Sequence, residues 1–482
     1  MMTIATLIVG CVMLIGCTGN DDVPAGFDRQ MTDCTIIFYG AGGSNLDADI
    51  YENLRQLYRG IADHNNVEAV VFFKNSSNIE DSIKNILDDQ GFDFHKATTY
   101  RFCVDRSLDD NVQMQFTDEN IFGGDSGNIN ITIVDTMAHY ISYAAAMRPA
   151  RHYVFVLADH GHGYAPQDER PEILQAFSRG LMADDGNNMQ CCTERGIRTA
   201  IERSGVDIDA VYIDACEMNT VETIYELSGV TKYIVSGTYV TPSVGGDYTS
   251  LVERLATCPD YGLAMAGYCD DVADWWKRCE ETSITPEDYI ASDITVVDTQ
   301  KLLMAAPALK RFIDQLTLDY TDSQLASQID AVTARAKASD NYGSLYDLCA
   351  YFDSLMVGVS SVALADAARE ARDLMMQCKL NSRGTVTTEQ NGLPSFNFLL
   401  GANGSWIDIK YNDDGGLKAI EQFYWDGTKT TTNYNTDGTV LDTKDSTWGN
   451  TGDETYGKLI FETLTGWSRW LKQNRLLPRP NV

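Results

Sequence analysis

Residues 153–161 read YVFVLADHG, and residues 210–216 read AVYIDAC. Both stretches begin with a run of apolar residues that is typical of a strand buried on both faces of a sheet. The first run leads into His160 and the second into Cys216. Ligands bind at the carboxyl ends of parallel strands in an open α/β sheet, so the sequence predicts an imidazole and a thiol at one edge. A cysteine nucleophile requires this arrangement.

Strand-like and helix-like segments alternate between residues 34 and about 255. Residues 67–73 (VEAVVFF) predict a second buried strand, and the apolar positions of residues 131–147 recur at the spacing of a helix. Thr193 is expected to cap another helix, which would end at Gly205. This alternation predicts an α/β fold with a doubly wound, mostly parallel sheet.

Two further regions are expected after this core. Residues 256–385 have mainly helical periodicity, with one strand expected at 294–297, and should form a helical region packed on the core. Residues 386–482 are rich in Gly, Thr, Asn, Asp and aromatic residues, and alternating runs such as 406–411 and 420–425 predict a β-meander with a closing helix at 463–474. We expect its aromatic residues to form the buried face of a small sheet; sugar or protein binding is the alternative.

Composition limits the classes of function. The 482 residues are enough for two or three domains, and a hydrophobic content of 44 % with 22 % charged residues is typical of globular proteins. The 37 basic and 69 acidic residues give a formal net charge of −32, which repels nucleic acid and anionic lipid and attracts basic peptides. Nucleic-acid binding is therefore not expected. The same acidity is also typical of the solvated surface of a secreted protein.

The N-terminus has the pattern of a processing signal. Residues 1–16 are apolar and uncharged, and the sequence LIGC at 14–17 resembles a bacterial lipobox. We expect a lipoprotein signal peptide over residues 1–17, lipidation of Cys17, and a polar tether over residues 18–30. No Lys or Arg precedes the apolar run, so a plain secretory signal is the alternative. The acidic residues after Cys17 favour a lipid-anchored protein of the bacterial envelope, at the outer membrane or cell surface.

The cysteines do not predict a metal site. Ten of the twelve cysteines lie beyond Cys11 and Cys17, without the paired CxxC spacing of zinc sites. Cys258, Cys269 and Cys279 are close enough in sequence for one disulfide, although buried free thiols explain them equally well. No cofactor is expected from this pattern.

The two reactive stretches resemble the clostripain-like family of cysteine peptidases, which has a caspase-like fold. In that family the first strand ends in Asn/Asp-His-Gly-x-Gly, here 159–163 (DHGHG), and the second ends in Asp-Ala-Cys, here 214–216. Cys216 follows His160 by 56 positions (216 − 160), close to the spacing in caspase-fold peptidases. Shorter matches occur at 34–47, 245–248 and 344–348, so the resemblance covers about residues 31–355.

The resemblance implies a caspase-like peptidase core over residues 31–255 and a cysteine endopeptidase that works with a His/Cys dyad. Cys216 would attack the scissile carbonyl, and His160 would protonate the leaving amine. The N–H groups of Gly161 and Cys216 would form the oxyanion hole. The sequence also predicts a helix at 217–227, whose dipole would favour the Cys216 thiolate. No third member of a triad is identifiable.

The family further implies protein or peptide substrates with Arg or Lys at P1, the residue before the cleaved bond. Asp214 would pair with this basic side chain, and Gly246 and Asp247 would line the same cleft. Capping of the following helix is the alternative role for Asp214. Relatives are often activated by self-cleavage, for which Arg179 is the candidate. Some relatives use calcium, and residues 184–187 (DDGN) are acidic, but they fit no EF-hand and are expected to form a solvated turn.

Two other functions are considered beside the peptidase. The first is a surface-binding or adhesion lipoprotein with a degenerate peptidase core, which the intact His160 and Cys216 argue against. The second is a metal-dependent hydrolase that uses His160 and His162. No acidic or His partner with ligand spacing accompanies this pair.

Overall fold

A computed structural model describes most of the chain beyond residue 30. The described residues are 31–42, 45–77, 97–104, 128–161, 163, 181–187, 190–282, 291–336, 345–399, 405–411, 417–424, 428–447 and 459–473. The predicted signal peptide, Cys17, the tether, His162 and Arg179 lie outside them. Among the described helices, none combines the length and apolar character that a membrane crossing requires.

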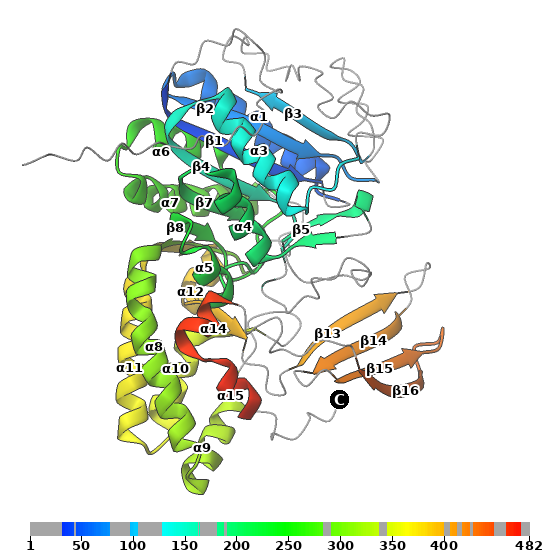
Figure 1. Cartoon of the computed structure of the whole chain (residues 1–482), viewed down its shortest axis with the longest axis vertical. Coiled ribbons are helices and arrows are strands. Elements are labelled where there is room, and N and C mark those ends of the chain that lie inside the picture. Colours follow the sequence, from blue (N-terminus) through cyan, green and yellow to red (C-terminus); the bar gives the residue numbers. More distant parts are fainter. Residues whose placement is uncertain are drawn as a thin grey trace, which may run out of the picture.

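The core is a sheet in the order β11-β9-β8-β7-β4-β1-β2-β3 (Figure 1). Its strands from β2 through β1, β4 and β7 to β8 run parallel, while β3, β9 and β11 are antiparallel to their neighbours. The predicted mostly parallel α/β sheet is therefore confirmed. The bounds are β1 Thr32–Ala41, β2 Val67–Lys74, β3 Thr99–Cys103, β4 Ala150–Ala158, β7 Ile208–Asp214, β8 Thr231–Ser236, β9 Asp293–Asp298 and β11 Lys379–Gly384.

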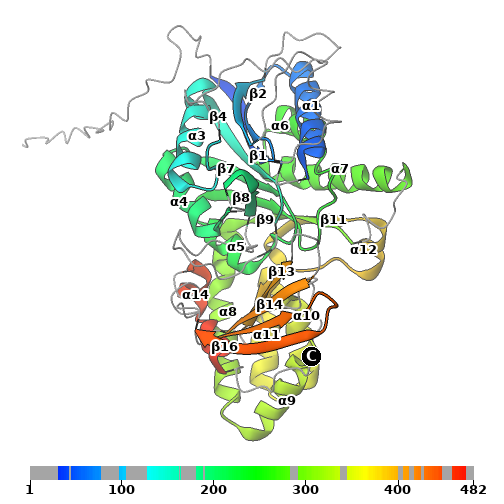
Figure 2. The same cartoon turned by 90° about the vertical axis from the view of Figure 1, so that its right-hand side faces the viewer.

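Helices cover both faces of the sheet (Figure 2). Along β1, Ile36 and Phe38 belong to one buried cluster and Ile37 and Tyr39 to another, because successive side chains of a strand point to opposite faces. The first cluster includes residues of α1 (Asp47–Asp63), α6 (Tyr248–Thr257) and α7 (Tyr261–Thr282). The second includes residues of α3 (Val134–Met147), α4 (Glu194–Ser204), α5 (Val221–Leu227) and α8 (Thr299–Asp319).

The helical region contributes to the sheet as well as packing on it. The helices α9 (Ser323–Thr333), α10 (Leu348–Gly358) and α11 (Val362–Gln377) lie beside α8 (Figure 1). The strand expected at 294–297 is confirmed as β9. The edge strand β11 reads KLNSRG, and this polar sequence gave no strand signal. A boundary at residue 255 therefore does not separate the sheet from the helices.

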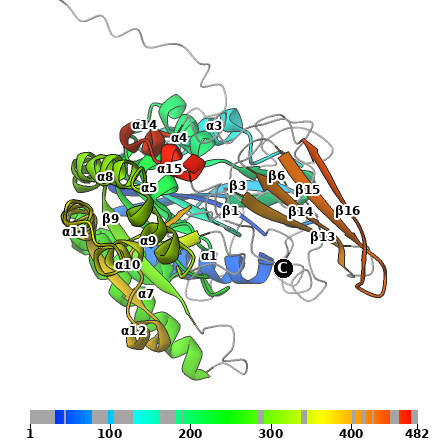
Figure 3. The same cartoon turned by 90° about the horizontal axis from the view of Figure 1, so that it is seen from below.

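The C-terminal region contains the expected meander. Strands β13 (Ser405–Tyr411), β14 (Leu417–Tyr424), β15 (Thr428–Tyr434) and β16 (Val440–Thr447) pair antiparallel in chain order. Figure 3 shows this sheet on the opposite side of the molecule from α8 and α11. The closing helix is two short helices, α14 (Ile460–Thr465) and α15 (Ser468–Gln473), separated at Gly466, whose φ is +72°.

Two short strand pairs, one 3-10 turn and one short helix complete the described elements. Strands β5 (Leu181–Asp184) and β6 (Gln190–Cys192) form a hairpin around the 3-10 turn η1 (Asp185–Asn187). Strands β10 (Leu345–Asp347) and β12 (Asn397–Leu399) pair antiparallel, and α12 (Val386–Asn391) follows β11. Among the described cysteines, no disulfide joins Cys258, Cys269 and Cys279.

Helices α4 and α5 bury three carboxyl groups. Thr193 caps α4 by accepting a hydrogen bond from the Gly196 N–H at 2.9 Å, as the sequence predicted. Glu194 follows this cap and is buried with Glu222 and Glu226 of α5. Desolvation, with the repulsion of the other two carboxylates, raises the pKa of Glu194 to about 8.

The raised pKa predicts that replacing Glu194 stabilises the protein at high pH. Since the folded-state pKa lies above the ordinary value of 4.5, the buried carboxyl costs nothing below pH 4.5, and its cost grows as the pH rises towards 8. Glu194→Gln should therefore raise the unfolding midpoint by about 2–4 °C at pH 8, which corresponds to about 2–4 kcal/mol, and change it little at pH 4.5. Thermal unfolding of both proteins across this range checks the sign. An equal shift at both pH values would contradict it.

Candidate active site

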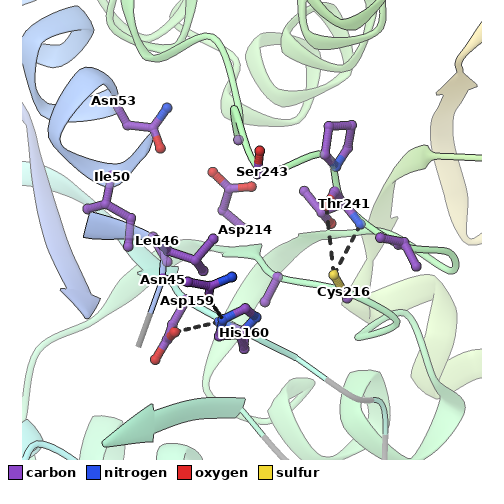
Figure 4. A pocket seen from close by; sticks show the side chains of 15 residues that line it. Asn45, Leu46, Ile50, Asn53, Asp159, His160, Asp214, Cys216, Thr241 and Ser243 are labelled. Atoms are coloured by element: carbon purple, nitrogen blue, oxygen red, sulfur yellow. Dashed lines mark hydrogen bonds between the residues drawn. The ribbon is translucent and has the colours of Figure 1, made fainter. Parts of the chain in front are cut away.

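The parallel pair β4 and β7 brings the two reactive residues to one edge of the sheet. Ala158 is opposite Asp214 in the register of the two strands. His160 lies two residues beyond the end of β4, and Cys216 two residues beyond the end of β7. Both side chains line one cavity of about 410 Å³. The imidazole and the thiol thus lie at one cavity, as predicted, with His160 beside Asn45 and the Cys216 sulfur beside Thr241 (Figure 4), and their action as a dyad stays a prediction.

His160 is held through its backbone and its ring. Its N–H donates to Asp159 Oδ1 at 2.6 Å, and its carbonyl accepts from the Met182 N–H at 3.1 Å, in the β5 strand. Its ring Nε2 lies 2.7 Å from Asn45 Oδ1. Burial raises the pKa of Asp159 well above its ordinary value, although the hydrogen bond from His160 opposes this shift. The position of the imidazole is therefore set by groups from three parts of the chain.

The Cys216 sulfur is held by one backbone segment. The Thr241 N–H donates to Sγ at 3.4 Å, and the thiol donates to the Thr241 carbonyl at 3.7 Å. Desolvation raises the pKa of this thiol to about 11. The expected lowering by a helix dipole does not occur, because α5 begins at Val221 and not at residue 217. A base must therefore remove the thiol proton.

Gly161 allows the two strand ends to approach closely. A Cβ at this position would lie 2.5 Å from the Cys216 carbonyl oxygen and 2.9 Å from Ala215 Cβ, so a larger residue would push the segments apart. The predicted oxyanion donors, the N–H groups of Gly161 and Cys216, therefore lie on touching segments. Their role stays a prediction.

Asp214 is a buried residue that lines the cavity. Its Oδ2 accepts hydrogen bonds from the Gly246 N–H at 3.0 Å and from the Tyr248 hydroxyl at 2.7 Å. Its Oδ1 is buried, and the Tyr212 hydroxyl is a further hydrogen-bonding neighbour of the carboxyl. Burial raises the pKa of Asp214, and the hydrogen bond from Tyr248 opposes this shift. The alternative role as a helix cap is filled by Thr220, which caps α5.

The predicted neighbours Gly246 and Asp247 do not line this cavity. Gly246 holds Asp214 through its N–H and is packed against the Tyr212 and Tyr268 hydroxyls. Asp247 caps α6 by accepting from the Ser250 N–H at 3.1 Å. Gly245 takes the position beside the cavity, with a φ of +64° that favours glycine.

Two asparagine side chains of the cavity had no role in the sequence-based prediction. Asn45 lies within the short match at 34–47 but was not singled out. Asn53, in α1, donates from Nδ2 to the Val244 carbonyl at 2.8 Å and lines the cavity. A Cβ on Gly245 would lie 2.8 Å from both Asn53 Oδ1 and Asp214 Oδ2, so the two side chains converge on this glycine.

The acidic turn considered for calcium is built around a lysine. The Lys74 ammonium, at the end of β2, lies 2.6 and 2.8 Å from the two oxygens of Asp184, 2.8 Å from Asn128 Oδ1 and 2.7 Å from the Ile129 carbonyl. Lys74 and Asp184 have exposed side-chain fractions of 2 % and 0 %. Asp185 binds Ser77 instead, through the N–H and hydroxyl at 2.8 Å. Within the described ranges, no group of three His, Cys, Asp or Glu side chains is placed to hold a metal ion.

Comparison with known proteins gives a consistent result. The model of the clostripain family matches residues 39–448. Clostripain from Hathewaya histolytica is 20 % identical over 411 residues, which cover 79 % of this chain and 75 % of clostripain.

Two solved structures share the fold. A secreted C11 cysteine protease from Bacteroides thetaiotaomicron, in complex with an irreversible peptide inhibitor, superposes with a TM-score of 0.54 at 14 % identity, covering 90 % of this chain and 99 % of that one. A secreted C11 cysteine protease from the same organism, called iotapain, gives 0.51 at 17 % identity, covering 74 % and 90 %.

The buried Lys74–Asp184 pair predicts a large loss of stability when only the lysine is removed. Lys74→Met leaves the Asp184 carboxylate buried without its counter-charge, which should lower the free energy of unfolding by about 3–5 kcal/mol. Lys301→Met is the matched control, because Lys301 is half exposed and 3.6 Å from Asp298, and should cost about 0–1 kcal/mol. Urea unfolding measures both changes. Equal effects of the two substitutions would contradict a structural role of the buried pair.

Proposed function

The chain belongs to the clostripain family and is a cysteine peptidase, and on this basis we propose that it is an endopeptidase that cleaves after Arg or Lys with a His160/Cys216 dyad. One observation supports this proposal above the others. The imidazole, the thiol and the buried Asp214 line the same cavity, at the ends of two paired strands. A nucleophile, a proton carrier and a negative charge for a basic side chain are thus within one site.

The proposed reaction begins with proton transfer. With a thiol pKa of about 11, only about one Cys216 in ten thousand is ionised at pH 7 without help, so the His160 imidazole accepts the thiol proton. The sulfur attacks the scissile carbonyl, and the Gly161 and Cys216 N–H groups stabilise the oxyanion. His160 then donates its proton to the leaving amine, and a thioester remains. Water, deprotonated by His160, releases the acid and restores the thiol.

The preference for a basic P1 residue rests on the polar end of the cavity. The buried Asp214 carboxyl lines the cavity with no positively charged group among its hydrogen-bonding partners, and a carboxylate in such a position is strongly stabilised by a cation. Asn53 Oδ1 provides a second, neutral acceptor nearby. The net charge of −32 also attracts basic substrates over longer distances. These features support Arg and Lys as the P1 residues.

Other parts of the prediction stay open to direct tests. Lipid anchoring through Cys17 and self-cleavage at Arg179 stay predictions, because both residues lie outside the described ranges. We propose that no calcium is needed to order the DDGN turn, since the Lys74 ammonium neutralises Asp184 there.

The dyad predicts that activity depends on one thiol and one imidazole. Cys216→Ala and His160→Ala should each lower cleavage of an Arg–fluorophore peptide by at least about 10³-fold, because both take part in bond breaking. Cys258→Ala and the exposed His139→Ala are matched controls away from the cavity and should keep full activity. A thiol alkylator should inactivate the enzyme, while EDTA should not. Activity that survives in Cys216→Ala, or is lost with EDTA alone, would overturn the dyad.

If Asp214 binds the P1 side chain, its negative charge should determine the preference for Arg and Lys peptides. Asp214→Asn removes the negative charge and should lower kcat/KM for Arg and Lys peptides by at least about 100-fold, while the labelling of Cys216 by iodoacetamide should stay within about threefold. Asp247→Asn is the control, since Asp247 caps α6 outside the cavity. Kinetics with matched Arg, Lys, Gln and Asp peptides measure the change. Cleavage of the four peptides in wild-type proportions by Asp214→Asn would contradict the assignment.

A further inference from the structure

We propose that Asn45 is a positioning residue that fixes the orientation and the tautomer of the His160 imidazole. This inference rests on the proposed function, in which His160 transfers protons to and from Cys216. It extends the dyad by a third side chain, which the sequence did not identify.

The contact is direct. Asn45 Oδ1 and His160 Nε2 are 2.7 Å apart, which is a short hydrogen bond between a ring nitrogen and an amide oxygen. Both residues line the cavity that contains Cys216. Figure 4 shows the Asn45 side chain beside the His160 ring, with the Cys216 sulfur across the cavity beside Thr241.

The backbone of Asn45 is fixed, as a positioning role requires. The Asn45 N–H donates to the Gly42 carbonyl at 3.0 Å, and the Leu46 N–H donates to the same oxygen at 2.6 Å. Gly42 in turn donates to the carbonyl of Lys74 at 2.8 Å, at the end of β2. The turn that carries Asn45 is therefore hydrogen-bonded at the carboxyl ends of the strands, where His160 also lies, because β1 pairs with both β2 and β4.

The chemistry of the contact sets the tautomer. An amide oxygen only accepts hydrogen bonds, so the neutral imidazole carries its hydrogen on Nε2 and keeps the lone pair on Nδ1. Nδ1 is then the atom that accepts the thiol proton. When the imidazole is protonated, Nε2–H still donates to Asn45, so the ring keeps its orientation through both proton transfers.

A neutral acceptor suits a group that must take up and release a proton in each cycle. A carboxylate at this position would stabilise the imidazolium and raise its pKa, which would slow the return of the proton to the leaving amine. The amide of Asn45 fixes the ring without adding a charge. This difference makes the Asp variant informative.

The test combines kinetics with the tautomer of the ring. Asn45→Ala should lower kcat for an Arg peptide by about 100-fold with KM within about twofold, because a misplaced base affects the chemical step and not substrate binding. In the Cys216→Ser background, which prevents self-cleavage, ¹⁵N-histidine NMR should show His160 as the Nε2–H tautomer. Adding Asn45→Ala should give a mixture of tautomers.

The Asn45→Asp variant tests how a negative charge beside His160 changes the pKa of the imidazole. In the Cys216→Ser background, Asn45→Asp should raise the pKa of His160 by about one unit in an NMR titration, because a carboxylate within hydrogen-bonding distance stabilises the imidazolium. Asn66→Ala is the matched control. Its Nδ2 donates to Asp33 and to the Ala256 carbonyl, both away from the cavity, and its loss should leave the titration and the tautomer of His160 unchanged.

The outcomes separate this inference from the proposed function. Wild-type kcat and an unchanged tautomer in Asn45→Ala would overturn the role of Asn45 and leave the dyad intact. Loss of activity with an unchanged tautomer and pKa would also overturn it, since the substitution would then act through the fold. Full activity in His160→Ala would overturn the proposed function itself.

Discussion

The parallel pairing of β4 with β7 is the interaction on which the site depends. Its register places Ala158 opposite Asp214, so that the chain leaves both strands at the same height and continues directly into His160 and Cys216. A slip by two residues would keep every side chain on its own face of the sheet but shift the end of one strand by about 7 Å along the other, and with it the imidazole relative to the thiol. Gly161 reinforces this register, because it lies against the backbone of Cys216 where no side chain fits.

Desolvation at this edge acts on several ionisable groups at once. It raises the pKa of Asp159, of Asp214 and of the Cys216 thiol, all of which are mostly enclosed by the strand ends and the loop that follows β8. Burial thus opposes the ionised form of each of these three groups in the free protein. In the proposed reaction, a basic substrate side chain would favour the ionised form of Asp214, and the imidazole would accept the proton of the Cys216 thiol.

The sequence predicted the parts of the molecule that local patterns determine. The apolar strands, the capped helix after Thr193 and the meander follow from periodicity and turn residues, and the position of His160 and Cys216 follows from their place after buried strands. Three features of the structure could not be predicted from the sequence. The edge strand β11 is polar, the start of α5 is set by the cap at Thr220, and the partners Asn45, Asn53 and Thr241 come from segments that meet only in three dimensions. The short sequence match at 245–248 also could not show that Gly245 lines the cavity while Gly246 and Asp247 do not.

The end of the chain takes part in enclosing the middle of the core. Glu226 in α5 accepts a hydrogen bond from the Ile460 N–H at 2.9 Å, and the rings of Tyr225 and Phe461 lie 5.4 Å apart. The sheet itself is completed only by β11, at residues 379–384. During synthesis, most of the chain must therefore leave the ribosome before α14 can cover α5. The apolar surface of α5 stays exposed on the nascent chain for longer than it would in a protein stabilised by local contacts.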